Sequence, residues 1–153
     1  MIKRKLTLEE RIIRLERLIR EGQEDLLSML FSGRPSQVSA ALSYGIDPNE
    51  KVNGKTALME VAMSNKYDKQ PISVASLILN NKVKLANVNL RDYDGRTALH
   101  YAAESDYAKL VKLLVNHGAN LNLRDADGKT ALDYAKQYNN KEVEDILINA
   151  GAV

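Results

Sequence analysis

The stretch "NLRDYDGRTALHYA", residues 89–102, occurs a second time as "NLRDADGKTALDYA" at residues 122–135, an offset of 33. Part of it also occurs upstream as "GKTALMEVA", residues 54–62, at the longer offset of 41. Self-similarity at this period indicates a solenoid of stacked units, none of which can bury its apolar face alone. The longer offset predicts extra residues at about 66–71 and 82–86, between apolar segments, where loops tolerate added length.

Each unit is predicted to contain two antiparallel helices followed by a hairpin. Thr97 is a good N-cap, because its hydroxyl can accept a hydrogen bond from a free backbone N–H of the first turn. A second apolar stripe begins near Leu110 and ends before Gly118, a residue type suited to the left-handed conformation that terminates many helices. Asp127 and Gly128 then favour a tight turn before the next threonine.

These residues resemble the ankyrin repeat family, whose pattern joins a T-P-L-H-x-A helix start, an apolar outer helix and a G-A-x-x-N ending. The resemblance implies an all-α ankyrin repeat solenoid of helix-turn-helix units with hairpin loops. Four repeats are expected at about residues 23–53, 54–94, 95–127 and 128–153, the first of them degenerate. The threonines, helix-ending glycines and hairpin asparagines that carry the match are Thr56, Thr97, Thr130, Gly45, Gly118, Asn49, Asn89 and Asn122.

The chain departs from the family pattern at two kinds of position. Alanine replaces the proline that follows each threonine, which gives up the preset φ of proline at the first helical position. The glycine expected between the two helices of a unit is replaced by Asn65, Asp106 and Asn139. Asparagine and aspartate tolerate a left-handed backbone better than most residues, so the turn is expected to survive.

The resemblance also implies a non-enzymatic module that binds a partner protein through the hairpin tips and inner helices. Arginine and tyrosine, which are enriched at interface hot spots, recur among the positions that vary in the family. Carried over residue by residue, the expected partner-binding set is Lys55, Arg91, Tyr93, Asp94, Arg96, Glu104, Arg124, Asp127, Lys129 and Gln137.

No pattern in the sequence indicates catalysis, a cofactor or a metal site. His100 takes the T-P-L-H position, and the resemblance implies that it hydrogen-bonds the backbone of the neighbouring loop. His117 is expected in solvent near a helix end, and two histidines at this distance without cysteine make no zinc-binding pattern. Acidic pairs recur at the repeat period in residues 92–94 and 125–127, which favours a role in hairpin turns over general acid–base chemistry.

Residues 1–22 lie outside the repeats and are predicted to form an amphipathic helix. The capping box "TLEE" at residues 7–10 marks its start and Gly22 its end. Its apolar seam would pack on the first repeat as a cap, pair with another chain as a short coiled coil, or receive a partner. The coiled coil gives the alternative function, a homo-oligomeric assembly or scaffold protein that dimerises through this helix. The seam residues are Leu8, Ile12, Leu15 and Ile19.

Composition narrows the classes of partner. The 153 residues include 22 lysines and arginines against 20 aspartates and glutamates, so the net charge of +2 gives no overall signature of affinity for nucleic acid or membrane. Cysteine is absent and no apolar run approaches the roughly 20 residues that a membrane helix needs. We therefore expect a cytoplasmic protein that binds another protein, with no nucleic-acid or membrane partner.

Overall fold

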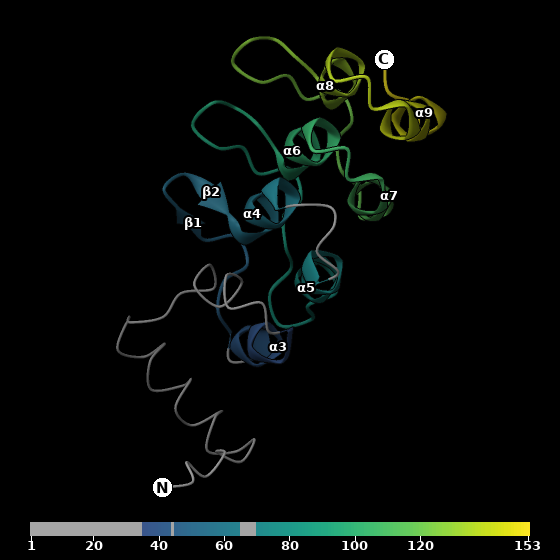
Figure 1. Ribbon diagram of the computed structural model, residues 1–153. Helices are drawn as coiled ribbons and strands as arrows, with labels where there is room; N and C mark the ends of the chain where they lie inside the picture. The colour runs from purple at the N-terminus through teal and green to yellow at the C-terminus, as the bar shows by residue number, and fades with distance from the viewer. Residues whose placement is uncertain (1–34, 44, 65–69) are drawn as a thin grey trace, which may run out of the picture.

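The computed structural model describes residues 35–43, 45–64 and 70–153, and within them short helices stack in pairs. Figure 1 shows α4, α6 and α8 following one another along the stack, with α5, α7 and α9 lying on one side of them and the hairpin loops on the other. The expected solenoid of helix pairs is thereby confirmed. The helices are α3 (Pro35–Ser43), α4 (Ala57–Met63), α5 (Gln70–Leu79), α6 (Ala98–Glu104), α7 (Ala108–Asn116), α8 (Ala131–Gln137) and α9 (Lys141–Asn149).

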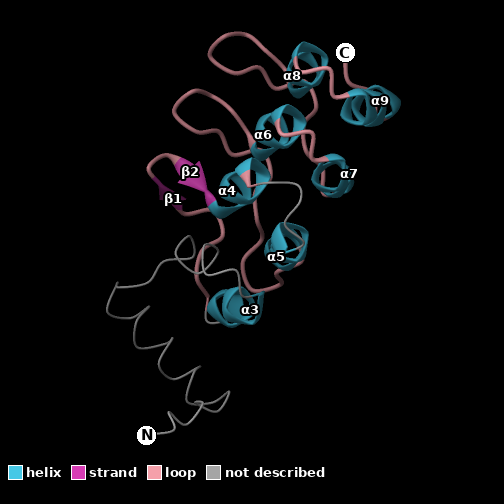
Figure 2. Ribbon diagram, viewed as in Figure 1, coloured by secondary structure: helices cyan, strands magenta, loops and turns pink. Residues whose placement is uncertain are grey.

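The inner helices α4, α6 and α8 each follow a hairpin loop. These loops are called here the α4 hairpin (residues 49–56), the α6 hairpin (89–97) and the α8 hairpin (122–130). The α4 hairpin contains a two-stranded antiparallel ladder, β1 (Lys51–Val52) paired with β2 (Lys55–Thr56), and the other two run as loops in the same place (Figure 2). No helix among the described residues is long and apolar enough to cross a membrane.

Small and aliphatic side chains fill the space between the two layers of helices. Ala102, Ala103 and Ala135 on the inner helices have no exposed surface, and such small side chains allow neighbouring helices to approach closely. Leu110 and Leu114 on α7 are also fully buried. The apolar stripes predicted from the sequence therefore form one continuous core along the stack.

The turn between the helices of a pair is built on a left-handed residue. Asp106 and Asn139 have φ values of 53° and 56°, so aspartate and asparagine do replace the family's glycine in that conformation. Asn65, the third such residue, lies outside the described residues. Gly118 ends α7 with φ of 80°, and the N–H of Ala119 donates to the carbonyl of Leu114 as in other left-handed helix ends.

Replacing Asn139 tests how much the left-handed backbone at this turn reduces the stability of the protein. We expect Asn139→Ala to lower the free energy of unfolding by about 1 kcal/mol, because alanine tolerates a left-handed backbone less well than asparagine does. Asn139→Gly removes the Cβ, which is strained at positive φ, and is expected to match or exceed the wild type. Urea unfolding of the three proteins measures the difference; equal loss in both variants would show that the asparagine side chain, not the backbone angle, is what matters.

The predicted insertions fall partly outside the described residues. Residues 65–69 are not described, and α5 begins at Gln70. The second insertion is an exposed loop after α5, in which the carbonyl of Leu85 accepts a hydrogen bond from Nδ2 of Asn49. Gly118 has positive φ just after α7, whereas no residue in the loop between Leu79 and Tyr93 does, so α5 and α7 end differently. The N-terminal helix predicted at residues 1–22, its seam and the start of the first repeat also lie outside the described residues.

Candidate functional site

Each hairpin that leads into α6 or α8 is closed by one aspartate. In the α6 hairpin Oδ1 of Asp92 accepts hydrogen bonds from the N–H groups of Asp94 (3.0 Å) and Arg96 (2.8 Å), while Oδ2 accepts from the hydroxyl of Tyr101 (2.5 Å). Asp125 makes the same contacts one repeat later, including one from the hydroxyl of Tyr134 at 2.7 Å. The turn role expected for these carboxylates is confirmed.

Polar contacts also join one hairpin to the next. Nζ of Lys51 donates to the carbonyl of Arg91 (2.6 Å), and Nη2 of Arg91 donates to the carbonyl of Arg124 (2.5 Å). The N–H of Ala126 donates to the carbonyl of Asp94 (2.8 Å). Arg91 therefore holds hairpins together, a structural task beside the partner contact that the sequence predicted for it.

His100 connects α6 to the following hairpin. Its Nδ1 accepts from the N–H of Thr97 (3.1 Å) and lies 2.9 Å from the threonine hydroxyl. Nε2, 3.1 Å from the carbonyl of Lys129, must then carry the proton and donate to it. The imidazole is 1% exposed, so the structural role expected for His100 is confirmed.

The surroundings of His100 make stability depend on pH. Burial lowers its pKa from 6.5, with a smaller lowering from Arg96, because the charged ring loses solvent. The unfolded chain then binds a proton more readily than the folded one, so the contribution of His100 to stability should be constant above about pH 6.5 and fall as the pH drops below it. Urea unfolding at about pH 7.5 and about pH 5.5 measures this. A His100→Asn variant should lose less stability over that interval; an equal loss would place the titrating group elsewhere.

Cationic side chains and tyrosine rings alternate across the inner helices. Nζ of Lys55 lies 5.8 Å from the ring centre of Tyr101, and Cζ of Arg96 lies between Tyr101 (4.1 Å) and Tyr134 (4.5 Å). Nζ of Lys129 lies 5.4 Å from the ring of Tyr134. Each such cation–π contact contributes an attraction of about 0.5–2 kcal/mol, depending on its exposure to water. We call Lys55, Arg96 and Lys129 the cation row.

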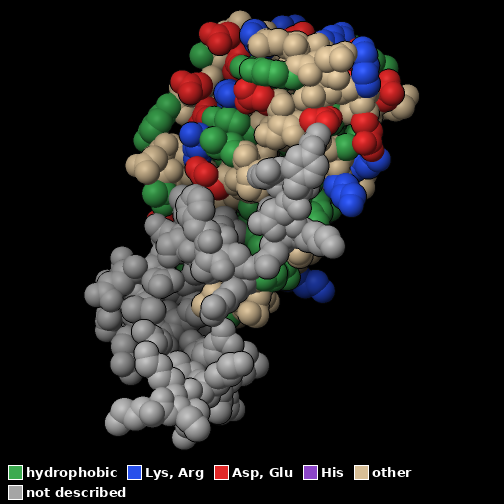
Figure 3. Space-filling view, in the orientation of Figure 1, with side chains coloured by type: hydrophobic (Ala, Val, Ile, Leu, Met, Phe, Trp, Pro, Cys, Tyr) green, Lys and Arg blue, Asp and Glu red, His purple; other side chains and the backbone are tan. Residues whose placement is uncertain are grey.

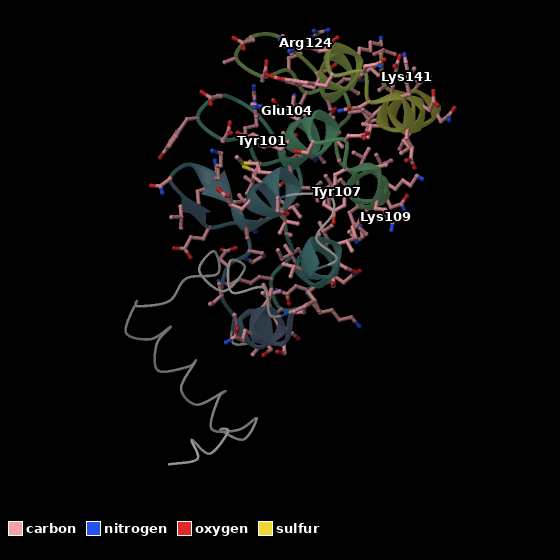
Figure 4. All side chains as sticks on the ribbon, viewed as in Figure 1. Tyr101, Glu104, Tyr107, Lys109, Arg124 and Lys141 are labelled. Atoms are coloured by element: carbon pink, nitrogen blue, oxygen red, sulfur yellow. The ribbon has the colours of Figure 1, made fainter. Side chains whose placement is uncertain are left out.

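Two residues complete the surroundings of the cation row. Arg96 forms an ion pair with Glu104, one turn along α6 from the ring of Tyr101 (Figure 4). Nζ of Lys129 donates to Oε1 of Gln137 at 2.7 Å. Burial and the hydrogen bond to Asp125 raise the pKa of Tyr134 to about 12, so this ring stays neutral at physiological pH.

Comparison with known proteins places this repeated geometry in a family. A model described as ankyrin repeats (3 copies) matches residues 18–125 and again residues 67–153. The chain belongs to the ankyrin repeat family. The resemblance seen in the threonine caps and hairpin asparagines is confirmed across nearly the whole sequence. Ankyrin repeats generally act as protein–protein interaction modules.

Three curated relatives each match part of this chain. Alpha-latrocrustotoxin-Lt1a of Latrodectus tredecimguttatus is 35% identical over 92 residues, which are 60% of this chain and 6% of the toxin. Alpha-latroinsectotoxin-Lt1a of the same spider is 33% identical over 90 residues, 59% of this chain and 6% of that protein. Protein glp-1 of Caenorhabditis elegans is 40% identical over 72 residues, 44% of this chain and 5% of glp-1. The chain thus spans a small fraction of each relative.

The ten residues expected to bind a partner lie on the hairpins and inner helices of the ankyrin stack. Six of them are exposed: Arg91, Tyr93, Asp94, Arg124, Asp127 and Gln137. The other four are half-buried in or beside the cation row: Lys55, Arg96, Glu104 and Lys129. Tyr93 stands out, because its side chain is 86% exposed while its ring lies against the backbone of Gly54 in the preceding hairpin.

The sequence prediction missed three residues of this surface. Lys51 links two hairpins, and Tyr101 and Tyr134 separate the cations of the row. The two tyrosines occupy the same position in successive repeats, which is the signal that could have found them. His117 also differs from expectation, because it is half-buried with Nδ1 2.8 Å from the carbonyl of Leu113.

Proposed function

We propose that this ankyrin repeat chain is a non-enzymatic module that binds a partner protein through the hairpin tips and inner helices. The observation that carries the proposal is Tyr93, a large aromatic side chain exposed at a hairpin tip and braced on Gly54. Tyrosine combines a large contact area with a hydrogen-bonding hydroxyl and few rotatable bonds, which suits it to interface hot spots.

The rigidity of the surface around Tyr93 supports the same proposal. Hydrogen bonds within and between hairpins fix the backbone of the tips before any partner arrives, as the contacts of Asp92 and Arg91 illustrate. A surface fixed in this way loses little conformational entropy on binding. The mechanism is therefore docking of a partner onto a rigid surface, with recognition as the activity.

A matched pair of variants tests the proposal. The surface variant, Tyr93→Ala with Asp94→Lys, removes one exposed aromatic ring and reverses one exposed acid at the tip of the α6 hairpin. The control, Ile148→Ala with Asp145→Lys, makes comparable changes on α9, where Ile148 is 49% exposed. The full chain is immobilised, a partner is captured from cells of the source organism, and the Kd of the purified partner is measured for all three proteins.

We expect the surface variant to weaken the Kd by about tenfold or more, and the control to leave it unchanged. Circular dichroism and urea unfolding confirm that both variants remain folded. A partner that binds the surface variant as tightly as the wild type would contradict the proposed surface.

The seam at Leu8, Ile12, Leu15 and Ile19 supports a separate candidate, a homodimer formed through the N-terminal helix. Its spacing of four, three and four residues is that of a short heptad repeat. Light scattering of the full chain distinguishes the two forms, since a dimer has twice the mass of 17.1 kDa. A concentration-independent monomer mass would remove this candidate and leave the binding surface untouched.

A further inference from the structure

We propose that the partner presents an extended acidic segment that runs across the inner helices and places two carboxylates against Lys55 and Lys129. This inference rests on the proposed function and names the chemical class of the partner. It follows from the cation row, from the neutral residues beside its two outer members, and from the distance between them.

The cation row is a repeated feature fixed by its neighbours. Lys55, Arg96 and Lys129 each precede a capping threonine, so the three occupy one position in successive ankyrin units. The rings of Tyr101 and Tyr134 lie against all three cationic groups at 4.1 to 5.8 Å. Long side chains held in this way keep their charges in place, so a partner meets cations that are already positioned.

Among the described residues, only the middle cation of the row forms an ion pair. Arg96 forms an ion pair with Glu104, whereas the position of Glu104 is taken by Met63 beside Lys55 and by Gln137 beside Lys129. The hydrogen bond from Lys129 to the neutral Gln137 leaves the lysine charge uncompensated. An ammonium group has three donors, so Lys129 retains capacity for a carboxylate.

The nearest acids on the same face do not remove the two outer charges. Glu60 stands where the later repeats carry a tyrosine, yet in the described part of the chain it forms no ion pair with Lys55. Asp92 and Asp125 use both of their carboxylate oxygens within their own repeat. In the described part of the chain, Lys55 and Lys129 therefore lie without an ion-pair partner on either side of the Arg96–Glu104 pair, and this pattern is complementary to two separated carboxylates.

The expected spacing of those carboxylates follows from helix packing. Packed helices lie about 8–10 Å apart, so two steps along α4, α6 and α8 separate the outer cations by roughly 16–20 Å. An extended chain rises about 3.3 Å per residue and its side chains alternate between two faces, so two acidic residues that both face the lysines stand about six positions apart.

A peptide fits this surface better than a nucleic acid does. Asp94 and Asp127 are exposed on the tips of the α6 and α8 hairpins, and Glu104 lies between the outer cations. Acidic and basic side chains are interspersed over the face that Figure 3 shows. The acids would repel a continuous line of phosphates, whereas a peptide can carry carboxylates only at the positions that contact lysines.

The test is selection of random peptides on the immobilised full chain, followed by fluorescence anisotropy with the selected peptides. We expect enrichment of sequences with two acidic residues about six positions apart, as estimated from the helix spacing. Lys55→Met with Lys129→Met should weaken their Kd by about tenfold or more. Binding should also weaken as NaCl rises from about 0.05 to about 0.5 M, because salt screens such contacts.

The control is Lys109→Met with Lys141→Met, which removes two ammonium groups from the outer helices α7 and α9 (Figure 4). It should leave the Kd unchanged, since it alters net charge equally but not the cation row. Urea unfolding verifies that both double variants are folded before the comparison is made.

The other outcomes separate the two proposals. Selected peptides that lose binding with Tyr93→Ala and Asp94→Lys but lack paired acids would overturn the acidic class and keep the binding surface. Peptides whose Kd is unchanged by both sets of variants would overturn both proposals. Failure to enrich any peptide, or tighter binding of a labelled single-stranded oligonucleotide than of the selected peptides, would overturn the acidic peptide.

Discussion

Replacing His100 with alanine is expected to lower the free energy of unfolding by about 3 kcal/mol, one of the two largest effects predicted for a single residue. The change leaves the N–H of Thr97 without its acceptor and removes one of two hydrogen bonds to the carbonyl of Lys129, which also accepts from the N–H of Asp125. Both groups lie at the junction of α6 with the α8 hairpin, and the removed ring leaves a cavity there. Urea unfolding monitored by circular dichroism measures the loss.

A second variant divides this effect between the two ends of the ring. His100→Asn places a side-chain oxygen where it can accept from the N–H of Thr97, as Oδ2 of Asp133 accepts from the N–H of Thr130 at 2.8 Å. Asparagine is too short to reach the carbonyl of Lys129, so about half of the loss should remain. If alanine costs less than about 1 kcal/mol, the contact between the two repeats does not stabilise the stack.

Gly95→Ala is expected to have the other large effect, lowering the free energy of unfolding by about 3 kcal/mol. Gly95 has φ of 75°, where any side chain is strained. A Cβ there would lie 2.7 Å from Nη2 of Arg91 and 3.2 Å from the backbone nitrogen of Ala126 in the next hairpin. The arginine end can shift only by giving up its link to Arg124, and the backbone of the next hairpin is held by its own hydrogen bonds.

Gly128 provides a matched control for this substitution. It occupies the equivalent position in the α8 hairpin with φ of 77°, but a Cβ there meets no atom within 4 Å. Gly128→Ala should therefore cost only the backbone strain, about 1–2 kcal/mol. The difference between the two variants in urea unfolding reports the contact between hairpins, and equal losses would show that this contact is without effect.

The sequence was informative wherever a structural element depends on residues close together in the chain. The threonine caps, the hairpin carboxylates and the left-handed Asp106 and Asn139 are local devices, and a repeat displays each of them more than once. Repetition allowed turn chemistry to be distinguished from a catalytic carboxylate pair. The repeat period also set which helices pack together.

Contacts between repeats were harder to predict, because they depend on the distance between units and not on spacing along the chain. The sequence predicts a partner contact for Arg91 but not the hydrogen bonds that its guanidinium donates to the carbonyls of Gly95 in its own loop and Arg124 in the next. The contact of Arg96 with two tyrosine rings arises only when neighbouring inner helices stand side by side. No pattern within a single repeat contains that information.

The links from Lys51 to Arg91 and from Arg91 to Arg124 have a mechanical consequence. They join successive hairpins along one edge of the stack, and the backbone bond from Ala126 to Asp94 reinforces that edge. Bending that separates the hairpins must break these bonds, whereas bending that spreads α7 from α9 meets packed apolar side chains and the exposed ion pair of Lys112 with Glu142. The stack is therefore stiffer against bending that opens its hairpin edge than against bending that opens its outer edge. A bound partner that pulls the hairpins apart works against the stiffer of the two.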